Sequence, residues 1–465
     1  MPAIQATELA AAFASGELSP LQVAQAALER IDAWEPRINA MYRIHRDAAL
    51  AAASASEARW REGRALSALD GVPITIKENI HTRGDPAPVG TRANEDAPAQ
   101  RADAPAAARV REAGCVILGK TTMPDFGMLS SGVSSLHGVT RNPWRLDRNP
   151  SGSSSGAGAA AVAGYAPLHL GTDIGGSVRL PATHCGIFAL KPSLGRVPVN
   201  PPYMGRVVGP MTRSVKDAAL LMDILARPDA RDFMSLPYQD CSFGSLAPHE
   251  PRRLRIGFLA EMGVGLQVHL EVRAAAESAA SALAGVGCEV ESMRSFLTAE
   301  MLDGTCRFFE ARSHNDLLQL AAAKREKVLP FVAEWCSWRA ERFSGRDVMQ
   351  AYTLVMAMRE AAVAASQRYD FILSPTSPIL PYEAELAAPG SDPRHALPHI
   401  AFTVPYNMSE QPAASLNWTY SGDGLPIGVQ VIGKRFDDAG VLGMCLLLEQ
   451  LRPKQRAWPE LSAAS

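Results

Sequence analysis

The chain has 465 residues, of which 47% are hydrophobic, and its 46 lysines and arginines nearly balance 48 aspartates and glutamates. This composition can form a large core, and the charge balance gives no indication of a nucleic-acid or anionic-membrane partner. The seven cysteines include no C-x-x-C pair, which indicates neither a disulfide framework nor a zinc site. The sequence shows no signal peptide and no apolar run suited to a membrane span, so we expect a cytoplasmic protein.

Predicted helices and short buried strands alternate along most of the chain. Helices are predicted over 3–63, at 105–112, between residues 158 and 173 (Ala-rich), at 218–226, at 271–283, over 297–366 and at 439–451. Strands are predicted at 72–76, at 115–118, ending at 191, at 253–259, at 288–290, at 371–376 and at 427–432. This alternation is typical of α/β proteins. Because no long linker separates two halves, we expect one large domain over 1–465.

Lys77 follows directly after the predicted buried strand at 72–76. A lysine in this position either extends its amine to the surface or is a buried amine with a lowered pKa. Local sequence leaves both interpretations open. Asn79 and Glu78 are close enough in the chain to hold the amine in place.

Two other patterns suggest chemistry that we do not expect here. Residues 114–121 match the phosphate-loop pattern G-x-x-x-x-G-K-[ST], but the predicted strand at 115–118 uses the N–H groups that such a loop needs free. His184 and Cys185 resemble a base beside a thiol. We place them on the strand that ends at 191, where neighbouring side chains point to opposite sides, so we expect a structural role.

Two loops of small residues, 151–158 and 173–177, each hold serines next to glycines. Glycine allows a tight turn and a close approach of the backbone to a ligand. A serine on such a turn can present a nucleophilic hydroxyl among free N–H groups. The alternative is a flexible Gly/Ser linker, which we disfavour because apolar helical segments separate and follow the two loops.

Lys77 and the two serine loops occur within a series of longer motifs. These are G-V-P-I-T-I-K-E-N (71–79), G-K-T-T-M-P-D-F (119–126), N-P-W (142–144), S-G-S-S-S-G (151–156), G-T-D-I-G-G-S-V-R-L-P-A (171–182), C-G-I-F-A-L-K-P (185–192), G-P-M-T-R-S (209–214), F-I-L-S-P-T (371–376) and D-G-L-P-I-G-V-Q (423–430). In this order and spacing they resemble the amidase signature family of serine hydrolases over most of the chain. The sequence departs from the family pattern where Ser151 and Ser155 replace two loop glycines.

The resemblance implies an α/β fold with a mixed central sheet covered by helices on both faces, and core motifs within 70–215. It implies that Ser177 is the acylated nucleophile, that Ser153 is a bridging serine after a cis peptide bond, and that Lys77 is the base. The N–H groups of Ile174, Gly175, Gly176 and also Ser177 would form the oxyanion hole, and no metal or cofactor is needed. From their positions on either side of the nucleophile, we expect Asp173 and Arg179 to pair as a structural brace.

The substrate is less defined by the sequence. We expect the pocket to use the 121–132 loop and segments within 297–415, with Met128, Leu129 and Ser130 contacting substrate. Aromatic residues of these segments include Phe308, Phe309, Trp335 and Trp338, and no obvious motif for a substrate carboxylate is present. We therefore expect hydrolysis of a small aryl or acyl amide.

Three alternatives to this expected function remain. The first is a carbamate or urea hydrolase of the same family. The second is the glutamine-hydrolysing subunit of a tRNA-dependent amidotransferase, which a short chain without an arginine-rich helical segment ahead of 371–376 disfavours. The third is a non-catalytic scaffold, which the filled catalytic positions disfavour. A small amide or carbamate is the expected partner, and a homodimer is left open.

Overall fold

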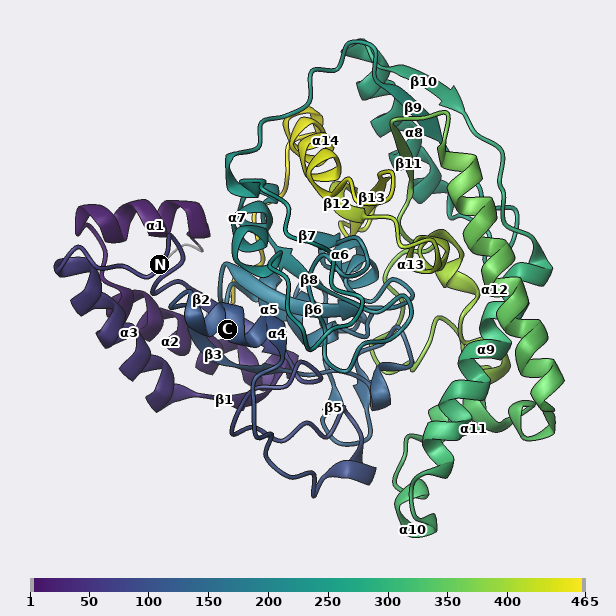
Figure 1. Ribbon diagram of the computed structural model, residues 1–465, viewed down its shortest axis with the longest axis horizontal. Helices are drawn as coiled ribbons and strands as arrows, with labels where there is room; N and C mark the ends of the chain where they lie inside the picture. Colours follow the sequence, from purple (N-terminus) through teal and green to yellow (C-terminus); the bar gives the residue numbers. More distant parts are fainter. Residues whose placement is uncertain (1–3, 462–465) are drawn as a thin grey trace.

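An eleven-stranded sheet runs through the computed structural model, which describes residues 4–461 (Figure 1). In spatial order the strands are β1 (Met41–Ile44), β3 (Val116–Thr121), β2 (Pro73–Lys77), β6 (Leu168–Asp173), β8 (Val207–Thr212), β7 (Phe188–Lys191), β12 (Ala413–Tyr420), β13 (Pro426–Ile432), β11 (Phe371–Pro375), β9 (Arg255–Phe258) and β10 (Glu289–Ser292). Strands β3, β2 and β6 are parallel, as are β11, β9 and β10, whereas the pairs between them are antiparallel. The predicted mixed α/β sheet is confirmed.

Helices cover both faces of this sheet. On one face, α5 (Ser155–Ala163) and α6 (Arg179–Cys185) pack against each other and against the central strands. On the other face lie α4 (Pro105–Glu112), α7 (Val215–Leu225), α8 (Leu270–Gly285) and α14 (Asp438–Leu451). All nine residues of α5 are buried, and they are Ala, Gly, Ser and Val. Such small side chains allow the helix backbone to lie close to the sheet.

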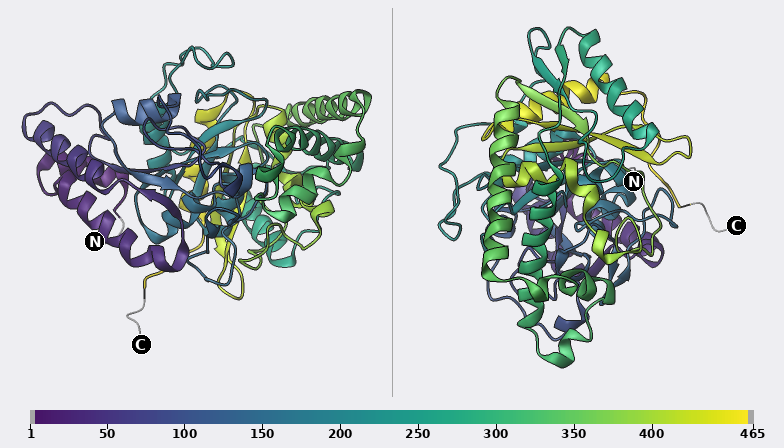
Figure 2. Two further views of the ribbon diagram at one scale, coloured as in Figure 1. Left: turned by 90° about the horizontal axis from the view of Figure 1, so that it is seen from below. Right: turned by 90° about the vertical axis from the view of Figure 1, so that its right-hand side faces the viewer.

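Two groups of helices lie at opposite ends of the molecule (Figures 1 and 2). The N-terminal group, in purple, contains α1 (Ala6–Ser15), α2 (Pro20–Ile38) and α3 (Arg46–Arg61). At the other end α9 (Ala299–Leu318) packs along α12 (Gly345–Ser366), next to α10 (Ala322–Arg325) and α11 (Pro330–Ser337). Helix α2 begins as its sequence predicts, because the Ser19 hydroxyl accepts hydrogen bonds from two first-turn N–H groups and Pro20 occupies the first turn.

The structure differs from the sequence prediction in several short segments. The expected helical region 3–63 contains the edge strand β1, and the stretch between 158 and 173, expected to form one helix, contains the end of α5 and the strand β6. His184 and Cys185 belong to helix α6 instead of a strand, since Gly186 ends that helix with a φ of +70° and β7 starts only afterwards. Between the predicted strands at 371–376 and 427–432, where no helix is predicted, lies the short helix α13 (Val404–Met408). Strands β8 and β12 were also not predicted. Gly209 and Pro210 weaken the local strand preference of β8, so its pairing with neighbouring strands determines its conformation. Strand β12 alternates apolar and polar residues over 414–420, which is typical of a strand.

The segment that matches a phosphate loop is part of the sheet. Lys120 and Thr121 belong to β3, which pairs with β1 and β2. The Lys120 amine is fully buried and donates to the carbonyl of Ile80. The interpretation of this segment as a strand is therefore confirmed. Within residues 4–461, no helix has both the length and the apolar character needed to cross a membrane.

Candidate active site

Two parallel strands bring the polar residues of the candidate site to one edge of the sheet. Strand β2 ends at Lys77 and its parallel neighbour β6 ends at Asp173, with Ile76 opposite Leu170. The carboxyl ends of parallel strands lie at the same edge, where ligands of α/β proteins commonly bind. The loop before α5 reaches the same place, so segments far apart in the sequence converge there.

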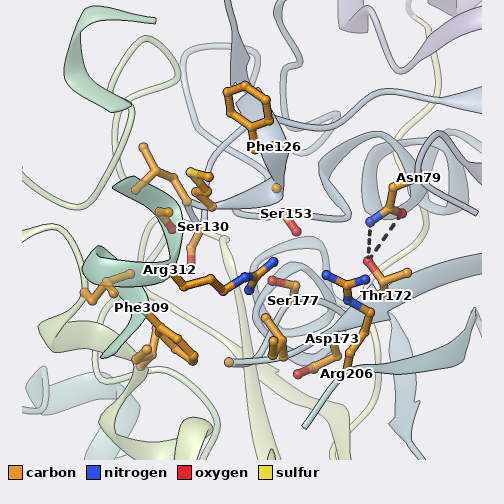
Figure 3. A pocket seen from close by; sticks show the side chains of 18 of the residues that line it. Asn79, Phe126, Ser130, Ser153, Thr172, Asp173, Ser177, Arg206, Phe309 and Arg312 are labelled. Atoms are coloured by element: carbon orange, nitrogen blue, oxygen red, sulfur yellow. Dashed lines mark hydrogen bonds between the residues drawn. The ribbon is translucent and has the colours of Figure 1, made fainter. Parts of the chain in front are cut away.

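Lys77 is fully buried, and its amine contacts three hydroxyl groups. Its Nζ lies 2.8 Å from Ser153 Oγ, 3.0 Å from Ser154 Oγ and 2.9 Å from Thr172 Oγ1. The Ser154 hydroxyl donates to the carbonyl of Thr172 over 3.2 Å. The Thr172 hydroxyl contacts both ends of the Asn79 amide, at 3.1 and 3.4 Å (Figure 3). The amine is thus surrounded by neutral partners.

Burial lowers the pKa of Lys77 from 10.5 to about 7. The charge of Asp173 opposes this shift, and the charge of Arg206 adds to it. The physical cause is the cost of placing an ammonium away from water without a carboxylate in direct contact. A substantial fraction of Lys77 is therefore neutral near pH 7, which a base requires.

Ser153 and Ser177 line the same cavity, and both side chains are visible in Figure 3. Ser153 is 3% exposed and Ser177 is 9% exposed. The two loops are joined by a hydrogen bond from the Ser154 N–H to the Ser177 carbonyl over 3.2 Å. Within residues 4–461 the Ser177 hydroxyl has no hydrogen-bond partner. Catalytic hydrogen bonds are often long in a ligand-free site and tighten when substrate is present.

The N–H groups expected to form the oxyanion hole are not equally available. The N–H of Gly176 donates to Asp173 Oδ1 over 2.8 Å. In the described part of the chain, the N–H groups of Ile174, Gly175 and Ser177 donate to no protein acceptor. The structure thus removes Gly176 from the predicted set of free donors, because a carboxylate in its own turn already uses that N–H. Ile174, Gly175 and Ser177 remain.

Asp173 and Arg179 form the predicted brace. Both side chains are fully buried, and Arg179 donates from Nε and Nη2 to the two oxygens of Asp173 over 3.1 and 3.0 Å. Arg179 also contacts Asn407 and Gln430, which fixes the loop that carries Ser177 against α13 and β13. Burial alone would raise the pKa of Asp173, but the charge and hydrogen bonds of Arg179 and a hydrogen bond from Asn407 hold it below its usual range.

A cavity lies beside Ser177. Met128, Leu129 and Ser130 line it, as the sequence predicts. The other lining residues are Asn79, Phe126, Gly127, Ser153, Thr172, Asp173, Ile174, Gly175, Ser177, Arg206, Phe309, Arg312, Ser313, Trp335, Leu397 and Ile400. Neither Phe308 nor Trp338 is among these residues.

Sequence analysis missed two functional candidates in this cavity, Arg206 and Arg312. They come from separate segments, and neither lies in a motif that resembles the family. Only the folded arrangement brings them beside Ser177. Within residues 4–461, no group of three or more His, Cys, Asp or Glu side chains has an arrangement that could hold a metal ion.

The loop before α5 has an unusual backbone. The Gly152–Ser153 peptide bond is cis, as the family resemblance implies. Ser151, which replaces a family glycine, has a φ of +63° in the left-handed region. Its N–H donates to Asn149 Oδ1 over 2.9 Å, which holds the turn. The replaced position is therefore one where glycine would be less strained.

Comparisons with known proteins agree over nearly the whole chain. The model of the amidase family matches residues 22–442. An acylamidase of Rhodococcus erythropolis is 33% identical over 97% of this chain and 96% of its own length. One subunit of the glutamyl-tRNA(Gln) amidotransferase of Symbiobacterium thermophilum is 33% identical over 99% of both chains. The structure of a bacterial aryl acylamidase of the amidase signature family superposes with a TM-score of 0.89 at 27% identity, over 97% of this chain and 96% of the other.

This chain therefore belongs to the amidase signature family and is a hydrolase that acts on C–N bonds.

The first prediction concerns the turn before Ser153. We expect Ser151→Gly to raise the free energy of unfolding by about 0.5–1 kcal/mol, because relief of the left-handed strain exceeds the entropy cost of glycine. Gly152→Ala should lower it by about 1–3 kcal/mol, since an added Cβ would lie 2.5 Å from the Ser131 carbonyl oxygen. Urea unfolding measures both. A destabilising Ser151→Gly variant would contradict the role assigned to the turn.

Proposed function

We propose that this amidase hydrolyses small aryl or acyl amides through an acyl-enzyme on Ser177, with Lys77 as the base and Ser153 as the bridge. One observation carries the proposal: the fully buried Lys77 amine lies 2.8 Å from the hydroxyl of Ser153, and Ser153 lines the same cavity as Ser177. A serine hydroxyl is un-ionised at neutral pH and needs a base as it attacks. A lysine with a pKa near 7 meets this need without histidine.

The hydrogen bonds around Lys77 support Ser153 over Ser154 as the proton carrier. A neutral amine has two N–H groups and one lone pair. The Ser154 hydroxyl donates to the Thr172 carbonyl, and the Thr172 hydroxyl contacts the Asn79 carbonyl oxygen, so both oxygens can accept from the amine. The lone pair is then left for the hydroxyl proton of Ser153.

The proton relay and the carbonyl addition follow from this arrangement. Ser177 attacks the amide carbon as its proton passes to Ser153 and the Ser153 proton passes to Lys77. The tetrahedral oxyanion accepts hydrogen bonds from the free N–H groups of Ile174, Gly175 and Ser177. The C–N bond then breaks as the relay runs in reverse and protonates the leaving amine. Water, activated by the same relay, hydrolyses the ester on Ser177 and releases the acid.

The cavity wall and the relatives support the acyl or aryl amide assignment. Met128, Leu129, Phe309 and Trp335 form an apolar part of the wall that suits an acyl chain or an aromatic ring. The two acylamidase relatives have matching lengths and folds. Carbamates and ureas have a similar carbonyl and belong in the same substrate panel.

A second candidate function is glutamine hydrolysis for a tRNA-dependent amidotransferase, favoured by the amidotransferase relative at 33% identity. It requires partner subunits. Copurification of two partners together with glutaminase activity would support it, whereas turnover of anilides by the isolated chain without glutaminase activity would exclude it.

The three consecutive serines allow a matched test of the relay. We expect Ser153→Ala to lower kcat for 4-nitroacetanilide by about 10²–10⁴-fold, as for loss of a proton-transfer group. Ser154→Ala should lower kcat by about 10-fold, because one N–H of Lys77 loses its acceptor. Ser155→Ala should change kcat by less than about two-fold, since in the described structure the buried Ser155 hydroxyl has no partner.

The remaining catalytic positions complete this experiment. Lys77→Ala and Ser177→Ala should each reduce kcat by at least about 10³-fold. Mass spectrometry should detect acylation on Ser177 in the wild type and none in Ser177→Ala. Unchanged turnover in either Lys77→Ala or Ser177→Ala would refute the proposed mechanism.

The pKa of Lys77 also predicts a pH profile. The neutral amine is the active form, so kcat/KM should increase tenfold per pH unit below about pH 7 and level off above it. A substrate without titrating groups, such as 4-nitroacetanilide, keeps the profile specific to the enzyme. An activity that keeps rising to about pH 10 would show that Lys77 retains an ordinary pKa.

A further inference from the structure

Two arginines from different segments enter the cavity beside the nucleophile. Arg206 directly precedes β8, and Arg312 lies on α9. Both line the cavity together with Ser177. In the view of Figure 3, their guanidinium groups lie on either side of the Ser177 side chain. Each guanidinium carbon also lies near the ring of Tyr203, at 5.3 Å for Arg206 and 4.2 Å for Arg312. The shared ring keeps the two positive charges close together.

Neither arginine has a strong acidic partner. Within residues 4–461, no carboxylate oxygen lies within 4.0 Å of the Arg206 guanidinium, whose one hydrogen bond donates to the Pro201 carbonyl over 3.4 Å. Arg312 has a single ion pair, from Nε to Asp316 Oδ2 over 3.8 Å, and Asp316 is 43% exposed. A long, exposed pair of this kind contributes little. Within the described residues, most N–H groups of the two guanidinium groups thus have no carboxylate partner.

The other charged groups of the cavity do not balance the two arginines. Asp173 is already paired with Arg179 and accepts further hydrogen bonds from Asn407 and backbone N–H groups. Lys77 adds no negative charge in either protonation state. Burial and then the neighbouring charge of Arg312 lower the pKa of Arg206 to about 10, and the charge of Asp316 opposes this shift only in part. The empty cavity therefore has an excess of positive charge.

We infer that the amides hydrolysed at Ser177 carry a carboxylate, which binds between Arg206 and Arg312. A guanidinium presents a planar set of N–H donors that matches a carboxylate in two parallel hydrogen bonds. Such an anion would supply the counter-charge that the protein lacks and would orient the amide relative to Ser177. This inference rests on the proposed function, because it assigns the substrate class of the same site. The carboxylate can belong to the acyl part or to the amine part of the amide.

Matched substrates distinguish these two sources. The acyl arm compares 4-nitroanilides of malonic, succinic, glutaric and adipic monoamides with neutral anilides of the same chain length. The amine arm compares 4-acetamidobenzoate with the neutral 4-acetamidobenzamide. We expect at least one carboxylate substrate to exceed its neutral partner in kcat/KM by about 10–100-fold, the factor typical of a hydrogen-bonded charge.

Substitutions then test the two arginines directly. Arg206→Met and Arg312→Met should each reduce the carboxylate preference, measured as the ratio of kcat/KM for a carboxylate substrate to kcat/KM for its neutral partner, by about 10-fold or more. Arg206→Lys and Arg312→Lys, which keep the charge, should retain part of the preference. Arg307→Met is the matched control on α9, since Arg307 pairs with Asp303 and does not line the cavity; it should leave the preference unchanged.

The outcomes separate this inference from the proposed function. Hydrolysis of neutral anilides that depends on Ser177, with no carboxylate advantage in either arm, would overturn the inference and leave the proposed function intact. Turnover that persists in Ser177→Ala would overturn the proposed function. The comparison of substrates uses the wild-type protein, so it remains decisive even if an arginine variant fails to fold.

Discussion

The candidate site depends on one constraint, the burial of the Lys77 amine among hydroxyl groups without a carboxylate in contact. An ammonium placed there loses its hydration, and three hydroxyl oxygens at 2.8–3.0 Å compensate for only part of that loss. This burial is the largest cause of the lowered pKa of Lys77, about 7, and the charge of Arg206 adds to it. Helix α5 contributes directly, because its small, fully buried residues let Ser153 and Ser154 approach the end of β2.

The same constraint explains the surrounding ion pair. Asp173 lies at the end of the strand adjacent to β2, and its charge raises the pKa of Lys77. Arg179 pairs with both oxygens of this carboxylate, which offsets that influence and keeps Asp173 from acting as the counter-ion of the lysine. Asp173 of this pair also accepts a hydrogen bond from the Gly176 N–H and thereby shapes the turn that carries Ser177. One ion pair thus sets both the electrostatics and the geometry of the site.

The sequence allowed prediction of those parts of the site that lie in contiguous motifs. Lys77, Ser153 and Ser177 were each placed by long motifs. Strand β2 followed from its buried apolar run, whereas its neighbour β6 was not predicted. Gly176 could not be distinguished from Gly175 as a donor, because the difference is a hydrogen bond to the side chain of Asp173. Strand β8 was missed for a related reason, since its local strand preference is weak and its conformation depends on pairing with β6 and β7.

The two cavity arginines show most clearly which parts of the site the sequence does not predict. Arg206 and Arg312 carry no local signal, since surface arginines are common and neither belongs to a motif. Their proposed role can be inferred only from the folded structure, in which α9 and the segment before β8 line one cavity. The proposed carboxylate site is therefore built from segments outside the sheet edge that holds Lys77, and sequence patterns predict such segments poorly.

Direct titration of Lys77 tests the account most sharply. The sequence has eight lysines, so a protein labelled with ¹³Cε-lysine gives few NMR signals. Burial also lowers the pKa values of Lys120 and Lys191 to about 7, and the Lys77→Arg variant therefore identifies the Lys77 signal by its loss. The account predicts that this signal titrates near pH 7. A Lys77 that titrates near its ordinary value of about 10.4 would contradict it, because the amine would then be charged when the enzyme acts.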